Sequence, residues 1–385
     1  MKTISILGST GSVGTQTIDV IRHNSERFQI VGLSTNKNID LLYKQIIEFH
    51  PKAVAVIDIG CANKLKSMLG DNKVEIFTGE DGLVNIAALD EADMVLTSVV
   101  GISGLIPTLK AISCNKEIAL ANKETLVAGG AIVKKALEKS NSCIIPVDSE
   151  HCAIFQCLEC SNNDSEIKKI ILTASGGPFR GKSINQLIDI SPENALKHPR
   201  WHMGKKISID CATLMNKGLE IIETHWLFDI SFDKIDVIVH PQSIIHSMVE
   251  YVDGSVIAQL GVTDMRNPIS FALGYPQRLQ SITKALDLIE ISSLTFEKPD
   301  MDTFRCLKLA CDAGREGGTM PVVLNAANEA AVDLFLNGRI TFLNIPDIVE
   351  QAMINHINIR NPGIEEILEV DRLTKSQIYN SLKGV

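Results

Sequence analysis

Two acidic residues, Asp148 and Glu150, stand two positions apart in the stretch PVDSEH at 146–151, at the end of a predicted strand. In an extended chain, side chains two residues apart point to the same side, so both carboxylates would face one way. Paired carboxylates at the end of a parallel strand can hold a divalent cation through hard oxygen ligands. The same spacing also suits a solvated acidic strand end, and the rest of the chain has to decide between the two.

Lys123 lies in the sequence ANKET, where a predicted strand at 117–120 meets a predicted helix at 125–139. A cation at the start of a helix opposes the helix dipole, so this position does little for stability. Ligands bind at the carboxyl ends of strands in open α/β sheets, so a lysine here is placed to meet an anion or a substrate oxygen. An exposed lysine without a function is the alternative.

Three polar residues, Asn216, Lys217 and Glu220, fall within a predicted helix at 211–228. Their spacing places them along one edge of the helix, where they could bind a phosphate and a metal ion side by side. The sequence SGG at 175–177 follows a predicted strand and could add backbone N–H groups and the Ser175 hydroxyl. A weak surface pair of Lys217 with Glu220 and a plain loop at 175–177 are the alternatives.

A glycine-rich turn near the N-terminus indicates a nucleotide site. The sequence GSTGSVG at 8–14 follows a short apolar strand and precedes residues at helical spacing. Glycines there allow a pyrophosphate to approach a helix N-terminus. The next predicted strand, 29–33, ends in STNKN, without the acidic residue that would hold the ribose hydroxyls of NAD. Lys37 in this stretch favours the 2′-phosphate of NADP, unless the stretch is only a polar loop.

The elements around these residues predict an α/β fold. Alternation of β and α predicts a doubly wound, Rossmann-like parallel sheet in residues 1–148. We expect an α+β catalytic domain at 149–273 with a lid loop at about 175–206, a linker at 274–300 and a C-terminal helical bundle at 301–385. Strands are predicted at 53–57, 74–77, 94–97, 117–120, 143–147, 168–173, 206–210, 235–239, 244–251 and 255–260, the last three in a mainly antiparallel sheet; helices are predicted at 41–49, 62–69, 105–113, 125–139, 152–160 and 211–228, and near 302–313, 320–337, 346–357 and 364–382.

Composition narrows the class of protein. The 385 residues are 45% hydrophobic and 22% charged, which is ordinary for a soluble protein, and the net charge of −9 without a dense basic block argues against nucleic-acid binding. Nine scattered cysteines indicate a reducing, cytoplasmic location. Cys152, Cys157 and Cys160 have the spacing of some iron–sulfur ligands, but their helical context favours buried thiols. We expect no signal peptide, because the first strand begins at Thr3, and no membrane span.

Seven motifs taken together resemble one family, 1-deoxy-D-xylulose 5-phosphate reductoisomerase of the non-mevalonate isoprenoid pathway. The motifs are GSTGSVG, LANKET, PVDSEH, TASGGPFR, HPRWHMGKKISIDCATLMNKGLE, HPQSIIHSMV and LNAANEA, in order along almost the whole chain. The resemblance implies a V-shaped homodimer with an NADPH domain, a catalytic domain and a helical bundle.

The resemblance also assigns residues by their matching positions. Metal ligands for Mg²⁺ or Mn²⁺, with Co²⁺ also allowed, would be Asp148, Glu150 and Glu220. Substrate contacts would be Lys123, Ser149, Glu150, Ser175, His198, Asn216, Lys217 and Glu220, of which Lys123 and His198 join the three metal ligands as catalytic residues. NADPH contacts would be Thr10, Gly11, Ser12, Val13, Lys37, Asn38, Asn122, Glu124 and Gly204, and His198, Trp201 and Met203 would lie on a closing loop.

One position departs from the family pattern. Where the family reads D-S-A-T near the substrate phosphate, this chain has Asp210-Cys211-Ala212-Thr213. A thiol is a weaker hydrogen-bond donor than a hydroxyl, so Cys211 would contact the phosphate more loosely.

The implied reaction rearranges and reduces 1-deoxy-D-xylulose 5-phosphate to 2-C-methyl-D-erythritol 4-phosphate. Glu150 would accept the hydroxyl proton, and the resemblance favours a retro-aldol/aldol route over an α-ketol shift. Two other functions stay open on the sequence. One is an NADP-dependent dehydrogenase that does not isomerise its substrate, and the other is a nucleotide sensor without turnover.

Overall fold

The computed structural model describes residues 1–70, 72–161, 163–197, 201 and 204–381. The chain forms two compact units. The first comprises Met1–Thr125, Val133–Cys152 and Asp264–Lys284, and the second comprises Leu126–Ile132, Ala153–Thr263 and Ala285–Val385. Each unit is therefore assembled from segments that are distant in the sequence.

A seven-stranded sheet organises the first unit. Its order is β4-β3-β2-β1-β5-β6-β7, and all neighbouring strands are parallel. The strands are β1 (Lys2–Leu7), β2 (Phe28–Thr35), β3 (Ala53–Val56), β4 (Glu75–Thr78), β5 (Met94–Thr97), β6 (Glu117–Leu120) and β7 (Ile144–Pro146). The order reverses between β1 and β5, and ligands of such folds bind at the strand carboxyl ends beside this point. The predicted doubly wound sheet is confirmed.

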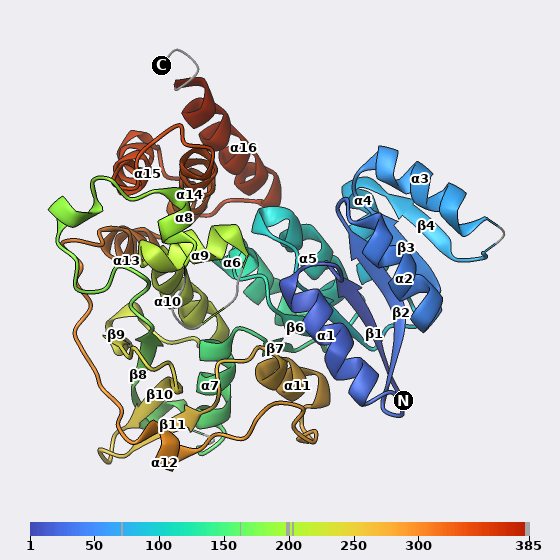
Figure 1. The fold of residues 1–385 in the computed structure, drawn as a ribbon, viewed down its shortest axis with the longest axis horizontal. Helices are drawn as coiled ribbons and strands as arrows, with labels where there is room; N and C mark the ends of the chain where they lie inside the picture. Colours follow the sequence, from blue (N-terminus) through green and yellow to red (C-terminus); the bar gives the residue numbers. More distant parts are fainter. Residues whose placement is uncertain (71, 162, 198–200, 202–203, 382–385) are drawn as a thin grey trace. The chain divides into compact units, whose positions relative to one another are not determined.

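Six helices connect or follow these strands, as Figure 1 shows: α1 (Ser12–His23), α2 (Ile39–Phe49), α3 (Ile59–Leu69), α4 (Gly79–Ala87), α5 (Leu105–Ser113) and α6 (Glu124–Leu137). The sequence did not predict α4, because two glycines in GEDGLVNIA hide its helical pattern. Helix α11 (Arg266–Gly274) lies in the first unit as well and packs against α1.

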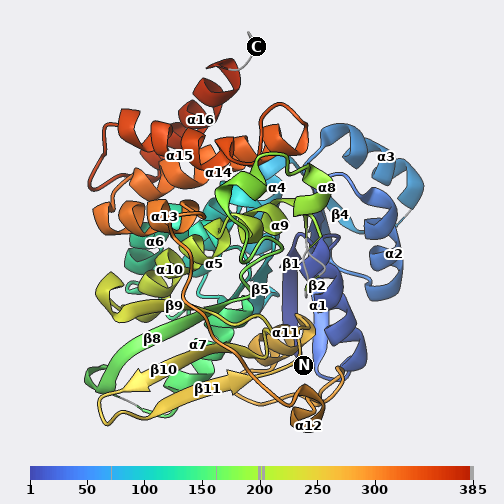
Figure 2. The same cartoon turned by 60° about the vertical axis from the view of Figure 1, so that its left-hand side comes forward.

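The second unit contains a four-stranded sheet in the order β11-β10-β8-β9. Its strands are β8 (Ile167–Ala174), β9 (Ile235–Val239), β10 (Ile245–Tyr251) and β11 (Val256–Leu260). Strand β10 runs antiparallel to both neighbours, whereas β8 and β9 are parallel. Figure 2 shows β8, β10 and β11 side by side. The predicted mainly antiparallel sheet is therefore confirmed, with one parallel pair added.

The helices of the second unit include the C-terminal bundle, coloured orange to red in Figure 1. They are α7 (Ser149–Leu158, which begins in the first unit), α8 (Pro192–Ala195), α9 (Lys205–Ala212), α10 (Met215–Phe228), α12 (Leu288–Ile291), α13 (Cys306–Glu316), α14 (Met320–Leu336), α15 (Asn344–Asn355) and α16 (Ile364–Ser381). A Cβ at Gly218 would lie 2.3 Å from Ala310 Cβ, so this glycine lets α10 and α13 pack closely. Apolar residues from α10, α13, α14 and α15 join the β-sheet in one core.

Two predicted elements are wrong. Residues 206–210 form part of helix α9 rather than a strand, because a short alternating run such as KKISID suits either structure and burial decides between them. Ser208, Ile209, Asp210 and Ala212 are buried, a spacing that fits one side of a helix. The single helix predicted at 211–228 is also divided, since Leu214 adopts a left-handed conformation with φ +60° between α9 and α10.

Candidate functional site

Asp148 and Glu150 lie between β7 and the first turn of α7 in the first unit. Glu150 belongs to the helix and not to an extended strand, so the reason that the sequence suggested for their pairing is wrong. The Asp148 side chain accepts a hydrogen bond from the Glu150 backbone N–H at 3.3 Å, which starts the helix. Carboxylate oxygens of the two residues nevertheless lie within 4.8 Å of each other. Ser149 Oγ donates to Glu150 Oε2 at 2.5 Å and holds that carboxylate in place.

Lys123 and His151 flank the Asp148 carboxylate. Lys123 Nζ lies 2.9 Å from Asp148 Oδ2, and His151 Nδ1 lies 3.6 Å from Oδ1. Burial raises the pKa of Asp148, but the charge of Lys123 and the contacts of His151 outweigh it and hold that pKa well below the usual value. Lys123 itself is buried, so the exposed lysine considered above is excluded. The structure thus brings together an ionised aspartate, a glutamate and a buried ammonium group.

The glycine-rich turn forms the start of α1 at the carboxyl end of β1. Gly8 has φ +87°, and a Cβ there would lie 2.8 Å from the Ser98 carbonyl oxygen, so only glycine fits between β1 and β5. The predicted cofactor residues Thr10, Gly11, Ser12 and Val13 follow this turn, with Gly11 at the N-cap of α1. Thr10 Oγ1 lies 2.6 Å from Thr35 Oγ1, which ties the turn to the end of β2. The turn therefore lies at a helix N-terminus, the position at which folds of this kind bind a pyrophosphate.

Lys37, which follows β2, has an exposed side chain. The Lys37 side chain is 71% exposed, and its Nζ lies 4.0 Å from Asp58 Oδ2, so the lysine is free to turn toward a phosphate. Asn38 caps α2 by accepting from the Leu41 N–H. Asn122 and Glu124 are instead engaged inside the unit, since Asn122 Nδ2 donates to Val99 O, Gly101 O and Glu124 Oε2 at 2.8–3.0 Å. Their assignment as direct cofactor contacts stays a prediction.

The second unit carries the other predicted substrate residues. Lys217 Nζ and Asn216 Nδ2 both donate to the Glu220 carboxylate from the same helix, α10. Lys217 and Glu220 are 3% and 1% exposed, so the solvated surface pair considered above is wrong. Buried charges are costly unless they are paired, and a helix that keeps this pair inside a protein core has a reason other than stability. The buried Lys217 and Glu220 and the half-buried Asn216 thus form one polar cluster.

The loop after β8 packs against the end of α9. Gly176 and Gly177 have φ of +83° and +68°, and a Cβ at Gly177 would lie 2.6 Å from the carbonyl oxygen of Cys211. Ser175 Oγ accepts from the Gly177 N–H at 3.2 Å. The glycines therefore let the Ser175 loop approach the backbone of Cys211, which joins two of the predicted phosphate contacts within the second unit.

The remaining residues singled out from the sequence differ in whether the structure describes them and in the role that it gives them. His198 and Met203 of the predicted closing loop lie outside the described residues. Gly204 is described and forms the N-cap of α9. His240, the first residue of the motif HPQSIIHSMV, has a structural role, since it is fully buried, its Nδ1 is 2.9 Å from Thr295 O and its Nε2 accepts from the Ile244 N–H.

Reasoning from the sequence missed His246, a buried residue of β10. Burial lowers its pKa to about 4, with a smaller contribution from the nearby charge of Lys217. Its ring centroid lies 6.1 Å from that of Trp201. The motif HPQSIIHSMV contains both histidines, but alternation along β10 puts His246 on the face of the half-buried Met248 and Glu250, so the strand pattern gave no sign that it is buried. His246 is therefore a neutral imidazole beside the predicted substrate residues.

We expect His246 to make stability depend on pH. Its folded pKa of about 4 lies below the unfolded value of about 6.5, so between these values the unfolded chain binds the proton and the folded chain does not. Its contribution to stability is thus fully present above about pH 6.5 and is lost progressively as pH falls from about 6.5 to about 4. From pH 7 to pH 5, His246→Gln should lose about 2 kcal/mol less stability in urea unfolding than the parent chain. Equal losses in both proteins would contradict the assignment.

All nine cysteines lie among the described residues and are free thiols. Burial raises the pKa of the Cys157 thiol to about 12, with a smaller contribution from Cys160, which opposes the thiolate form that an iron–sulfur cluster needs. Cys211 is half-buried. The expected buried thiols are therefore seen at Cys152 and Cys157, whereas Cys160 is exposed.

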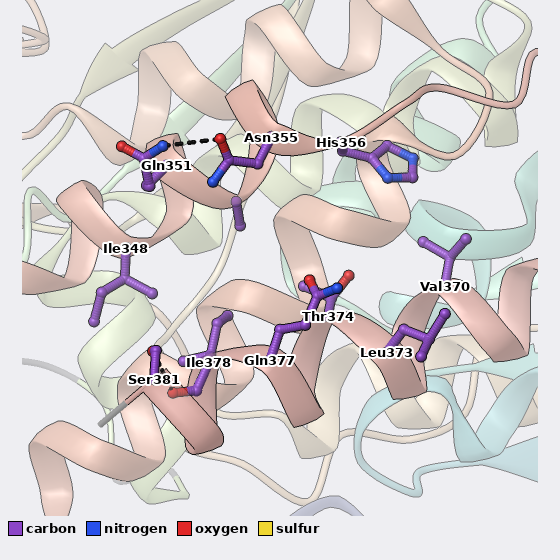
Figure 3. Close-up of a pocket in the computed structure, with 11 residues that line it drawn as sticks. Ile348, Gln351, Asn355, His356, Val370, Leu373, Thr374, Gln377, Ile378 and Ser381 are labelled. Atoms are coloured by element: carbon purple, nitrogen blue, oxygen red, sulfur yellow. Dashed lines mark hydrogen bonds between the residues drawn. The ribbon is translucent and has the colours of Figure 1, made fainter. Parts of the chain in front are cut away.

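A cavity of about 390 Å³ lies between α15 and α16 in the C-terminal bundle (Figure 3). Its lining includes Gln351, Asn355, His356, Thr374 and Gln377, together with apolar side chains, and contains no charged residue. Gln351 Nε2 donates to Asn355 Oδ1 across one turn of α15. Without an acid–base pair or carboxylates, this cavity is not a candidate for the chemistry above.

Within the described ranges, no helix is long and apolar enough to cross a membrane.

Comparisons with known proteins point to one family. The family model described as 1-deoxy-D-xylulose 5-phosphate reductoisomerase matches residues 4–130, and two C-terminal models of the same enzyme match residues 144–228 and 260–377. A relative of that name from Clostridium perfringens is 54% identical over 98% of this chain and 99% of its own length. Another from Thermoanaerobacter pseudethanolicus is 58% identical over 98% of both chains.

Solved structures agree with these sequence matches. The chain resembles the Zymomonas mobilis 1-deoxy-D-xylulose 5-phosphate reductoisomerase in complex with NADPH, at 40% identity and a TM-score of 0.92 over the full length of both chains. It also resembles a DOX-P reductoisomerase in complex with NADPH, fosmidomycin and magnesium, at 41% identity and a TM-score of 0.95, covering 100% of this chain and 98% of the other.

Proposed function

The chain belongs to the 1-deoxy-D-xylulose 5-phosphate reductoisomerase family. From that membership we propose a function for the residues around Asp148 in the first unit and for those around Glu220 in the second. The enzyme converts 1-deoxy-D-xylulose 5-phosphate to 2-C-methyl-D-erythritol 4-phosphate with NADPH and a divalent metal ion, a step of isoprenoid precursor biosynthesis. The observation that carries the assignment of the site is the pair of buried carboxylate–ammonium groups, Asp148 with Lys123 and Glu220 with Lys217.

The carboxylates suit a hard cation. Asp148 and Glu150 in the first unit would hold Mg²⁺ or Mn²⁺, and Glu220 from the second unit would supply the third oxygen ligand. Asp148 fits this role because its pKa is held low and it offers an ionised carboxylate. A divalent ion in this position supplies Lewis-acid polarisation of the substrate carbonyl group, and NADPH supplies the hydride for the reduction.

The remaining chemistry belongs to side chains of the protein. Glu150, held by the Ser149 hydroxyl, would accept the proton of a substrate hydroxyl when the carbon–carbon bond breaks. The Lys123 ammonium would stabilise negative charge that develops on substrate oxygens. We favour the retro-aldol/aldol route, for which the positions of Glu150 and Lys123 provide a base and an oxyanion partner.

The phosphate of the substrate would be held by residues of the second unit. Lys217 supplies a buried positive charge, Asn216 supplies an amide, and the Ser175 loop supplies a hydroxyl beside the backbone of Cys211. His198 and Trp201 would exclude water from above the substrate. On the NADPH side, the turn at 10–13 would hold the pyrophosphate and Lys37 the 2′-phosphate, with Asn38 and Gly204 beside the cofactor.

We also propose a homodimer in the cytoplasm. Strand β11 is the edge of its sheet and exposes Val256 and Leu260 by 48% and 36%. An exposed apolar edge strand is a site for pairing with a second chain, and sedimentation equilibrium measures that pairing. The nine free thiols support a reducing location.

A metal-dependent assay tests the proposed function. NADPH oxidation with 1-deoxy-D-xylulose 5-phosphate should fall to the background after a chelator removes divalent ions and should return on addition of Mg²⁺. Turnover that survives complete chelation would favour an NADP-dependent dehydrogenase that does not need the acidic cluster. NADPH binding without turnover under any metal condition would favour a nucleotide sensor.

We expect Cys211→Ser to lower the KM for the phosphorylated substrate by up to about fivefold or to leave it unchanged, because a hydroxyl donates a stronger hydrogen bond worth about 1 kcal/mol. Steady-state kinetics measure the effect, and Cys311→Ser on α13 is the control for loss of a half-buried thiol elsewhere. A large rise in KM for Cys211→Ser alone would show that the pocket is built around sulfur or that Cys211 is not at the phosphate.

A further inference from the structure

Asn328 is a buried amide in an apolar helix of the C-terminal bundle. It is fully buried on α14, where Ala327, Ala330 and Ala331 are buried neighbours. Its Nδ2 donates to Asp210 Oδ1 at 2.7 Å, whereas its Oδ1 has no hydrogen-bond donor among the described residues. A buried amide whose carbonyl oxygen has no donor costs stability, so an alanine would suit a purely structural helix better. The bond to Asp210 is what the asparagine adds.

Asp210 receives bonds on both carboxylate oxygens. Lys206 Nζ, one turn earlier on α9, lies 3.0 Å from Oδ2, while Asn328 occupies Oδ1. Asp210 is 1% exposed, and a buried carboxylate requires such partners to remain charged. The Lys206 pair lies within α9, and the bond from Asn328 ties the C-terminal turn of α9 to α14.

That turn leads directly into the strained connection between α9 and α10. Leu214 is buried with φ +60°, a conformation that a bulky residue keeps only where its surroundings hold it. Thr213 Oγ1 lies 3.1 Å from Ile209 O and accepts from the Met215 N–H at 3.3 Å, which links the two helices. The connection therefore depends on a firmly held end of α9.

We propose that Asn328 is a positioning residue for the substrate phosphate. Through Asp210 it fixes the end of α9, and so sets Cys211 relative to Asn216 and Lys217 at the start of α10. The proposal rests on the proposed function, in which those three residues bind the phosphate. Through Asn328, the C-terminal bundle would contribute to substrate recognition as well as to the stability of the fold.

Asn325 provides a matched control on the same helix. It is also fully buried, its Nδ2 donates to a carboxylate, that of Glu329, at 3.0 Å, and its Oδ1 likewise has no donor among the described residues. Asn328→Ala and Asn325→Ala therefore remove the same atoms and the same kind of bond, but only the first releases Asp210.

The experiment compares KM for 1-deoxy-D-xylulose 5-phosphate and for NADPH in the full-length protein. We expect Asn328→Ala to raise the KM for the phosphorylated substrate by about tenfold, a free energy of about 1.4 kcal/mol, and to leave that for NADPH within about twofold. Asn325→Ala should leave both values within about twofold. Equal substrate KM values for the two variants would overturn the proposal.

Two further variants separate the proposal from its premise. Lys217→Met should raise the substrate KM more than Asn328→Ala does; if it does not change the KM, the phosphate assignment itself fails. If Asn328→Ala shows no cooperative melting transition, the double variant Asp210→Asn/Asn328→Asp replaces it as the test. The exchange keeps one hydrogen-bond donor and one acceptor between positions 210 and 328. Near-parental substrate KM in that folded exchange variant supports the positioning role, and a KM raised about tenfold or more despite the restored bond contradicts it.

Discussion

Replacing Glu220 by glutamine is expected to lower turnover by about 10³-fold, a loss of about 4 kcal/mol of transition-state stabilisation, while the chain stays folded. Glu220 would be one of three oxygen ligands, and the neutral amide would weaken the hold on a divalent ion. The glutamine keeps an oxygen that can accept the bond from Asn216. Lys217 would lose its charged partner, which should raise the KM for the substrate as well.

Turnover measured over a range of Mg²⁺ concentrations checks this expectation, with thermal melting to confirm the fold. Glu329→Gln is a close control, because the Glu329 carboxylate also accepts from an asparagine four residues away, Asn325, and lies 2.7 Å from a lysine, Lys375. Both substitutions remove one charge from an Asn–Glu–Lys group of the second unit. Similar rates for Glu220→Gln and the parent chain would refute the three-carboxylate metal site.

Replacing Lys123 by methionine is expected to lower turnover by about 10²-fold, the loss typical of removing one group that stabilises an oxyanion. The acidic limb of the pH–rate profile should also move to higher pH. Burial raises the pKa of Asp148 and Lys123 lowers it, so without the ammonium the carboxylate is protonated at pH values where the parent enzyme keeps it charged.

The sign of the accompanying stability change follows from the depressed pKa of Asp148. In the parent chain this carboxylate stabilises the fold above its unfolded pKa of about 3.9, and that contribution is lost as pH falls through the lower folded pKa. Lys116→Met is the control, since Lys116 is a largely buried lysine of the same unit whose Nζ donates to the Asp90 backbone carbonyl at 3.0 Å. An acidic limb at the same pH in Lys123→Met and the parent would contradict the pairing with Asp148.

Much of the first unit could be predicted from local patterns. Short buried runs such as Ala53–Val56 and Met94–Thr97 alternate with amphipathic helices, and this alternation permits few arrangements other than a parallel sheet. The glycine-rich turn was also predictable, because its function depends on backbone freedom that the sequence displays directly. Helix α9 was not predictable, since a six-residue alternating run is compatible with both a strand and a helix.

The candidate site was predicted by residue type but not by geometry. Asp148 and Glu150 were expected to pair in an extended strand, and they pair across the start of helix α7 instead. His246 gave no chemical signal on its own, because its low pKa comes mainly from burial, which the sequence does not display. Asp210 and Asn328 are 118 positions apart, so no local pattern could connect them.

The order of residue types along the chain specifies which functional groups are present: the glycine-rich turn, the acid-free end of β2, the PVDSEH stretch and the polar edge of α10. Which of these groups are buried, and what they touch, depends on the folded chain. Lys217 and Glu220 have the spacing of a weak surface pair, and in water they would be worth little. Burial makes their charges strong and costly to separate, because the protein interior screens them far less than water does.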